Sequence, residues 1–322
     1  MKPAHALTAQ KLTVQRGSLS VLCEVDLSIH ATQWTCVVGP NGAGKTTLLK
    51  AMAGLLPSTG ELHVQDQDLR KLAAKDRAKM IAWLGQQEQG SDDLSVNDVV
   101  MLGRLPHQSS WVGADAQDIA QAQTWLALLQ LMPLKEKSLA QLSAGERQRA
   151  LLGRALAVQA PILLMDEAFS ALDPLIRTDM QSVLLDLQQE LGKTIVFITH
   201  DLDEALRLGD QVAILRDGQL IQQGTAQQIV LKPADDYISS FVRDVNRGRV
   251  IRCKTLMTPG EGVDGPTVDA SLVIEEAARI MSAEGKETAN VVNSKGKLMG
   301  IITMSDIIGA MVPPQEDAIS VI

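Results

Sequence analysis

The stretch GPNGAGKTT, residues 39–47, decides the fold of this 322-residue chain. It fits the phosphate-loop pattern G-x-x-x-x-G-K-[ST] and follows the apolar run WTCVV, which is typical of a buried strand. TTLLKAMAGLL then places leucine and methionine at helical spacing. In this setting backbone amides and the helix N-terminus can surround phosphate groups, while Lys45 reaches the β- and γ-phosphates and Thr46 ligates Mg²⁺. A chance glycine-rich turn is the alternative, and it leaves the lysine and threonine without a role.

Two neighbouring acids, Asp166 and Glu167, end a second apolar run, ILLMDE at 162–167. A carboxylate at the carboxyl end of a strand beside the phosphate loop can hold the Mg²⁺ shell, which is the role we expect for Asp166. Glu167 can orient or deprotonate a water that attacks the γ-phosphate. The alternative is that Glu167 is merely exposed at the end of the strand. Together the loop and the acids predict a nucleotide hydrolase.

A third stretch, LSAGERQ at 142–148, precedes the helical pattern ERQRALLGRALA. Small residues at a helix start leave backbone amides free for an anion, so this end is a candidate second phosphate contact. An ordinary N-cap at Ser143 is the alternative.

The remaining patterns predict an α/β fold. KLTVQRGSLSVLCEVDLSIH is typical of two antiparallel strands, and TIVFITH and QVAILRDG are apolar runs typical of strands buried on both faces. We therefore expect a P-loop fold with a central, mostly parallel sheet, an antiparallel β subdomain and a helical insertion at about 90–160. A charged, then Gly/Pro-rich segment indicates a boundary, so we expect one domain at 1–245 and a linker with a small α/β module at 246–322.

Composition narrows the function classes. The net charge of −8 argues against nucleic-acid binding driven by bulk charge, so no nucleic-acid partner is expected. Three cysteines without metal-ligand spacing indicate isolated thiols of a reducing compartment. We find no signal-peptide pattern and no uncharged run of about 18 residues, which leads us to expect a cytosolic chain.

These motifs resemble those of the ATPase subunit of ATP-binding-cassette (ABC) transporters over about residues 8–245. The resemblance identifies ILLMDE as the Walker B strand, SALD (170–173) as the D-loop, His200 as the switch histidine and Gln86 as the glutamine that touches Mg²⁺ and couples to the membrane subunit. It also implies that two copies sandwich two ATP molecules, with Asp173 at this interface. The residues implied to bind ATP in the Walker A loop are Gly39, Pro40, Asn41, Gly42, Ala43, Gly44, Lys45, Thr46 and Thr47, and those of the signature facing the partner's nucleotide are Ser143, Ala144, Gly145 and Glu146.

Two positions depart from the family pattern. Ala144 stands where the signature usually has glycine, which makes close backbone approach tighter. Arg16 stands where an aromatic ring usually stacks on adenine; because a guanidinium also stacks on a base, we expect altered base affinity rather than loss of binding.

The sequence also resembles two kinds of importer. The segment QGSDDLSVNDVVMLGRLPHQSSW resembles ATPases for iron-chelate, haem or cobalamin import, whereas the chain from MDEAFSALDP onward resembles ATPases that import glycine betaine and related quaternary amines. GIITMSDI and LMTP resemble parts of a CBS motif, in which Thr303 and Asp306 would face a ribose. A purely structural appendage is the alternative for this tail, and a natural or constructed mosaic is the alternative for the whole chain.

The resemblance implies an ATPase subunit that uses ATP and Mg²⁺ to drive solute uptake. Its partners would be a second copy of itself, integral membrane permeases and a solute-binding protein, with the subunit peripheral at the cytoplasmic face of the membrane. We expect quaternary amines such as glycine betaine as cargo, with iron-siderophore, haem or cobalamin import as the alternative. A soluble non-transport ATPase of DNA repair or translation and a regulatory nucleotide sensor are the rival classes.

Overall fold

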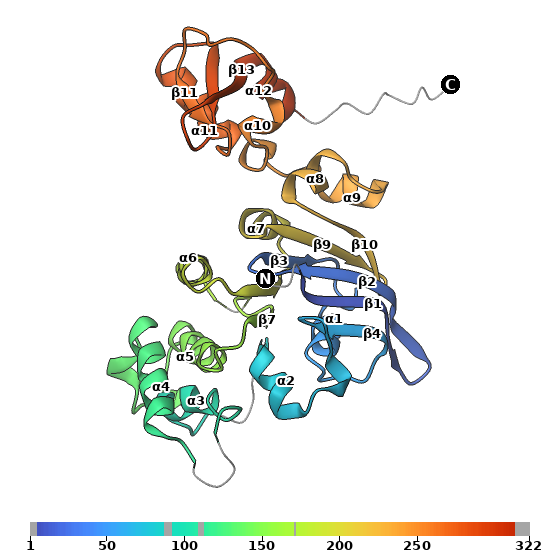
Figure 1. Ribbon diagram of the computed structural model, residues 1–322, viewed down its shortest axis with the longest axis vertical. Helices are drawn as coiled ribbons and strands as arrows, with labels where there is room; N and C mark the ends of the chain where they lie inside the picture. The colour runs from blue at the N-terminus through green and yellow to red at the C-terminus, as the bar shows by residue number, and fades with distance from the viewer. Residues whose placement is uncertain (1–4, 87–91, 109–112, 171, 313–322) are drawn as a thin grey trace. The chain divides into compact units, whose positions relative to one another are not determined.

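The computed structural model describes residues 5–86, 92–108, 113–170 and 172–312. It divides into two compact units, 1–223 and 224–322 (Figure 1). Along the chain, the division at 223/224 comes before the domain boundary that we predict at 245. The boundary at 245 stays a prediction. The first two residues of the predicted insertion, 90 and 91, lie outside the described residues.

A six-stranded sheet forms the centre of the first unit, in the order β10-β9-β3-β8-β7-β6. The pairs from β9 to β6 run parallel, as the sequence predicts. Every residue of β3, β7 and β8 is buried, and most are apolar, because helices cover both faces of a parallel sheet. The strands are β3 (Trp34–Val38), β6 (Ile81–Leu84), β7 (Ile162–Asp166), β8 (Thr194–Ile198), β9 (Gln211–Arg216) and β10 (Gln219–Gly224).

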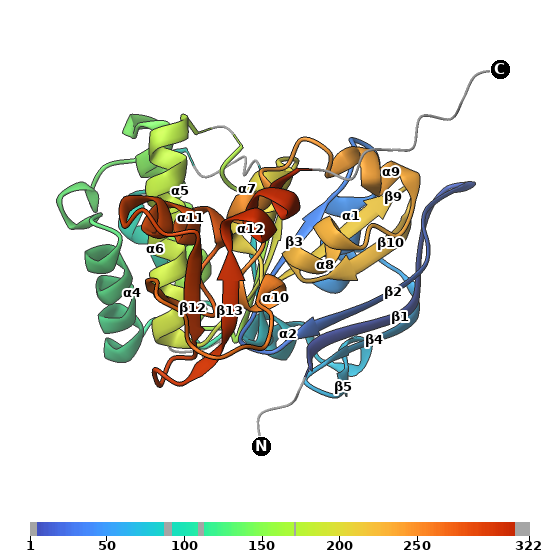
Figure 2. The same ribbon diagram turned by 90° about the horizontal axis from the view of Figure 1, so that it is seen from above.

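A second sheet, with the order β2-β1-β4-β5, supplies the predicted antiparallel part of the first unit. Figure 2 shows β1 and β2 as a long ribbon that runs beside β4. Alternating apolar residues of this sheet share one core with α1 and the central sheet. The strands are β1 (His5–Arg16), β2 (Leu19–His30), β4 (Thr59–Val64) and β5 (Gln67–Asp68).

Helices supply the rest of the first unit, and α3, α4 and α5 form the predicted insertion. Arg104, just after α3, holds these helices together: its Nε donates to Asp118 Oδ1 at 2.9 Å and its Nη1 to the Ala157 carbonyl at 2.8 Å. Both side chains of this ion pair are buried. The helices are α1 (Lys45–Met52), α2 (Ala74–Met80), α3 (Val96–Leu102), α4 (Ala116–Leu128), α5 (Ala144–Ala157), α6 (Pro174–Leu191) and α7 (Leu202–Leu208), with short 3₁₀ turns η1 (Leu69–Lys71), η2 (Met132–Leu134) and η3 (Leu139–Gln141).

The second unit contains a three-stranded sheet, β11-β12-β13, with α11 and α12 packed together beside it (Figures 1 and 2). These strands and helices agree with the small α/β module that the sequence predicts for the tail. The second unit has its own core, a cluster of buried apolar residues. The elements are α8 (Ala226–Leu231), α9 (Asp236–Phe241), η4 (Arg247–Arg249), α10 (Cys253–Leu256), β11 (Thr267–Asp269), α11 (Ile274–Ala283), β12 (Thr288–Val292), β13 (Leu298–Thr303) and α12 (Met304–Met311).

Within the described ranges, no helix has both the length and the apolar character that crossing a membrane requires.

Candidate functional site

The predicted phosphate loop connects β3 to α1, and its three glycines, Gly39, Gly42 and Gly44, all adopt backbone conformations that L-residues rarely adopt. Gly39 has φ 147° and Gly42 has φ 82°. A Cβ on Gly39 would lie 2.1 Å from the Leu215 carbonyl oxygen of β9, whereas a Cβ on Gly42 would meet no atom within 4 Å. The first glycine is therefore required by packing and conformation, and the second by conformation alone.

Lys45 is the first residue of α1 and is largely buried. Its Nζ donates to the carbonyl oxygens of Gly39 at 2.9 Å and Pro40 at 3.1 Å. Burial lowers the pKa of the Lys45 ammonium, while the charges of Glu167 and Asp166 act in the opposite direction. The carbonyls of the loop therefore hold the Lys45 ammonium at the point where phosphate groups would enter.

Asp166 is the last residue of β7 and its side chain meets α1. The Thr46 hydroxyl donates to Asp166 Oδ1 at 2.9 Å. Burial raises the pKa of the Asp166 carboxyl, a shift that the Thr46 hydrogen bond opposes. The loop threonine and the strand-end acid therefore lie within hydrogen-bond distance of each other, and their role as Mg²⁺ ligands stays a prediction.

Glu167 follows Asp166 with its backbone in the left-handed region, at φ 44°. Gln86, two residues after β6, donates from Nε2 to Glu167 Oε2 at 2.9 Å. The Ser170 amide also donates to the Glu167 carbonyl at 3.0 Å, which closes a turn directly behind the acid. A positive φ is costly for a residue with a side chain, by about 1–2 kcal/mol, so these contacts fix where the carboxylate lies.

Lys45, Thr46, Gln86 and Glu167 border one cavity of about 420 Å³, whereas Asp166 and Gly39 do not line it. Arg16, at the end of β1, lies in its wall, as the stacking prediction requires. Val21 is a lining residue that the sequence analysis missed; only the strand pairing of the antiparallel sheet could have indicated it. The lining residues are Arg16, Val21, Asn41, Gly42, Ala43, Gly44, Lys45, Thr46, Thr47, Gln86 and Glu167.

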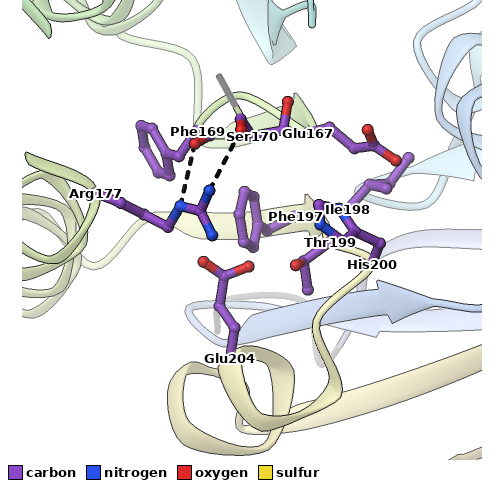
Figure 3. Close-up of a pocket in the computed structure, with 9 residues that line it drawn as sticks. All are labelled: Glu167, Phe169, Ser170, Arg177, Phe197, Ile198, Thr199, His200 and Glu204. Atoms are coloured by element: carbon purple, nitrogen blue, oxygen red, sulfur yellow. Dashed lines mark hydrogen bonds between the residues drawn. The ribbon is translucent and has the colours of Figure 1, made fainter. Parts of the chain in front are cut away.

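His200 lies at the end of β8 and borders a second, much smaller cavity of about 10 Å³, together with Glu167. Figure 3 shows this cavity, with the Glu167 and His200 side chains at one end and Arg177 at the other. His200 is exposed and does not line the larger cavity. Thr199, the residue before it, is buried and accepts a hydrogen bond from the Asp201 amide at 3.0 Å. His200 is therefore not a buried core histidine.

The signature residues form an N-cap at the start of α5. The Ser143 hydroxyl accepts from the Glu146 amide at 3.3 Å, and Glu146 Oε2 accepts from the Ser143 amide at 2.8 Å. The Ser143 hydroxyl, which donates to Glu146 Oε2 at 2.7 Å, and the Ser143 amide together lower the pKa of Glu146. Ala144 is exposed and Gly145 is buried against Ile176. The structure thus shows the ordinary capping role, and the contact with a partner's nucleotide stays a prediction.

Asp173 also caps a helix. Its Oδ1 accepts from the Leu175 and Ile176 amides, both at 3.1 Å, at the start of α6. Ala171 of the predicted D-loop lies outside the described residues. The interface role of Asp173 stays a prediction.

In the second unit, Thr303 and Asp306 form another reciprocal cap, at the start of α12. The Asp306 amide donates to Thr303 Oγ1 at 3.1 Å, and the Thr303 amide donates to Asp306 Oδ2 at 3.2 Å. Both side chains therefore have a structural role, and their contact with a ribose stays a prediction.

The donors beside the phosphate loop fit Mg²⁺. This hard cation prefers oxygen ligands and keeps several waters, so one or two protein oxygens together with phosphate oxygens suffice. Thr46 and Asp166 supply a hydroxyl and a carboxylate within hydrogen-bond distance of each other. The Gln86 side chain lines the larger cavity, as Thr46 does. The part of the chain that the structure describes holds no cluster of three His, Cys, Asp or Glu side chains suited to a metal.

Comparison with known proteins identifies the family. Residues 22–170 match the ABC transporter family and residues 253–313 match the CBS domain. The glycine betaine transport ATP-binding protein OpuAA of Bacillus subtilis is 35% identical over 94% of this chain and 72% of its own length. The glycine betaine/carnitine transport ATP-binding protein GbuA of Listeria monocytogenes is 37% identical over 91% of this chain and 73% of its own length.

Solved structures agree in fold. The dimeric structure of a bacterial ABC transporter cassette matches with TM-score 0.61 and 26% identity over 68% of this chain and 98% of that one. An inward-facing putative metal-chelate type ABC transporter matches with TM-score 0.61 and 26% identity over 70% of this chain and 85% of that one. The chain therefore belongs to the ABC transporter family, as an ATP-binding subunit whose ATP hydrolysis is coupled to transport and which carries a CBS domain.

Proposed function

We propose that the cavity beside the phosphate loop binds ATP with Mg²⁺ and that Glu167 is the general base of its hydrolysis. The single observation that carries this assignment is the pair of contacts Thr46–Asp166 and Gln86–Glu167, both at 2.9 Å. These contacts support different roles for the two acids. Asp166 is joined to α1, the helix that would receive the phosphates, whereas Glu167 lines the cavity.

In this mechanism the loop amides and Lys45 would bind the phosphates, and Thr46 and Asp166 would hold Mg²⁺, which would supply positive charge opposite the phosphoryl group. Glu167 Oε2 accepts a hydrogen bond in the present structure, so the same oxygen is able to accept one from an attacking water. His200 borders the cavity behind Glu167 and would contact the γ-phosphate from the carboxyl end of β8. Ser143 and Asp173 of a second copy would complete the site, and the dimeric structure of a similar cassette supports an assembly of two copies.

Changing Glu167 to glutamine tests the assignment. The amide keeps the shape of the side chain but cannot take a proton, so turnover should fall by about 10²–10⁴-fold while ATP binding persists. Steady-state phosphate release and binding of a fluorescent ATP analogue measure the two effects. The matched control is Glu61→Gln on β4, an exposed acid outside the site. Turnover that survives in Glu167→Gln would remove the assignment.

For the cargo we propose quaternary-amine osmolytes, taken up through permease subunits and a solute-binding protein at the cytoplasmic face of the membrane. Relatives whose names state glycine betaine and carnitine transport support this proposal, since they align with more than nine-tenths of the chain. Import of a metal chelate is the second candidate, and the similarity to a metal-chelate type transporter supports it. Co-purification with a permease of each type, followed by uptake of labelled glycine betaine into vesicles, distinguishes the two candidates.

A further inference from the structure

The small cavity behind Glu167 and His200 is bordered by two charged side chains that the ATPase mechanism does not use, Arg177 of α6 and Glu204 of α7. In Figure 3 the guanidinium of Arg177 faces the carboxylate of Glu204 across the cavity. Neither residue lines the larger cavity beside the phosphate loop. A direct role in ATP binding is therefore not available to them.

Arg177 holds the chain segment that follows Glu167. Its Nε donates to the Phe169 carbonyl at 3.2 Å, and its Nη2 donates to the Ser170 and Leu172 carbonyls, each at 3.3 Å. One planar guanidinium thus collects carbonyls from the turn that begins at Glu167. A lysine could not reproduce this arrangement, because an ammonium is a single point donor.

Glu204 holds the opposite side of the cavity. Its residue is 8% exposed, and its carboxylate accepts from the Gln181 amide, which in turn accepts from Arg207. The Thr199 hydroxyl lies beside the same carboxylate (Figure 3) and lowers the pKa of Glu204, as does the charge of Arg177, although burial raises it overall. Because Thr199 directly precedes His200, the position of Glu204 bears on the switch histidine.

We propose that Arg177 and Glu204 are positioning residues that couple the segment behind Glu167 to the segment that carries His200. Arg177 fixes the carbonyls after the general base, Glu204 fixes the residue before the histidine, and their opposite charges face each other across the cavity. The inference rests on the proposed roles of Glu167 and His200. The inference adds to these roles by naming the residues that hold the Glu167 and His200 side chains in position relative to each other.

The backbone conformation of Glu167 is strained, so contacts from neighbouring residues are needed to maintain it. Its φ of 44° lies in the left-handed region, where a residue with a Cβ is strained. Strain of this kind persists only where neighbouring contacts over-determine the conformation. The Ser170 amide supplies one such contact and Arg177 supplies three more on the same turn. Loss of Arg177 would let the turn relax and move the Glu167 carboxylate.

Three single variants and one double variant test the proposal by steady-state ATPase assays on the full chain. Because misplacement of a catalytic group by about 1 Å costs up to 10²-fold in rate, kcat should fall about 10- to 100-fold in Arg177→Met, with KM for ATP within about threefold of wild type. Arg177→Lys should restore little of this loss. Glu204→Gln, which keeps an acceptor for Gln181 but loses the charge, should lower kcat by a smaller factor. In Arg177→Met/Glu204→Gln the loss should be less than the product of the single losses.

Controls separate this proposal from others. Arg70→Met removes an exposed arginine paired only at the surface with Asp68, and it should leave kcat unchanged. A merely structural role for Arg177 would lower the unfolding midpoint without changing kcat of the folded protein, and that result would overturn the proposal, as would strictly multiplicative losses. If Arg177→Met does not fold, Arg177→Lys and Glu204→Gln decide. Turnover that survives in Glu167→Gln contradicts the assigned base instead, whatever the Arg177 variants show.

Discussion

Replacing Gly39 and Gly42 by alanine, one at a time, separates conformational strain from steric overlap in the phosphate loop. Both glycines have a positive φ, so each alanine should cost about 1–3 kcal/mol through backbone strain. Only at Gly39 does the new Cβ meet the Leu215 carbonyl, at 2.1 Å. Because this oxygen belongs to a buried strand, β9 must shift, which costs a further ~1–3 kcal/mol. We therefore expect Gly39→Ala to be less stable than Gly42→Ala by about 1–3 kcal/mol.

Urea unfolding followed by tryptophan fluorescence measures this difference. All four tryptophans precede residue 126, so the signal follows the first compact unit alone. ATP binding provides the second readout: Gly42 lines the larger cavity and Gly39 does not, so a folded Gly42→Ala protein should show the larger loss of affinity relative to its loss of stability. Equal destabilisation by the two alanines would refute the overlap argument, because the strain alone would then account for both.

Three further predictions concern other parts of the chain. Asp118→Asn breaks the buried ion pair with Arg104 and should lower the free energy of unfolding of the first unit by about 3–5 kcal/mol, whereas the exposed Asp76→Asn should change it by less than about 0.5 kcal/mol in the same urea titration. Burial raises the pKa of Asp166, so the folded Mg²⁺-free protein keeps a proton that the unfolded chain has lost. Its stability should fall as the pH rises from the unfolded toward the folded pKa, and Asp166→Asn should flatten this part of a urea-midpoint against pH curve. Thr303→Ala removes the cap of α12 and should cost about 1 kcal/mol, seen as faster amide exchange in that helix.

Much of the fold follows from short-range pattern. β3, β7 and β8 are apolar runs of five residues ended by a glycine or a polar residue, and such strands are readable because burial on both faces leaves little choice of side chain. β11 is different: three residues, Thr267–Asp269, carry too little pattern to predict a strand, and their pairing with β12 depends on the tertiary structure. The division at residue 223 was equally hidden, because α8 and α9 carry ordinary helix signals that do not indicate which core they join.

The capping boxes show why a motif can predict a ligand contact and a local contact at once. Ser143 to Glu146 and Thr303 to Asp306 share the spacing of a hydroxyl followed three residues later by an acid. By resemblance we predict that the first pair contacts the partner's nucleotide and that the second pair faces a ribose. An N-cap is the alternative for Ser143. The structure fills both pairs with reciprocal hydrogen bonds to backbone amides. A helix start that exposes amides to an anion needs the same residues that cap it, so only a bound nucleotide distinguishes the two roles.

Arg177 and Glu204 could not be predicted as partners because nothing in their spacing brings them together. Their 27-residue separation spans all of β8 and most of α6, and only the packing of α6 and α7 against the end of β8 places both beside one cavity. Motif residues and framework residues therefore carry different information. The letters DE predict that a base exists, but the local Ser170 hydrogen bond on the strained turn of Glu167 is joined by stabilisation from residues outside the motif. That stabilisation comes from Gln86 on one side and from the Arg177 contacts on the other, so the orientation of the base is a property of the tertiary structure.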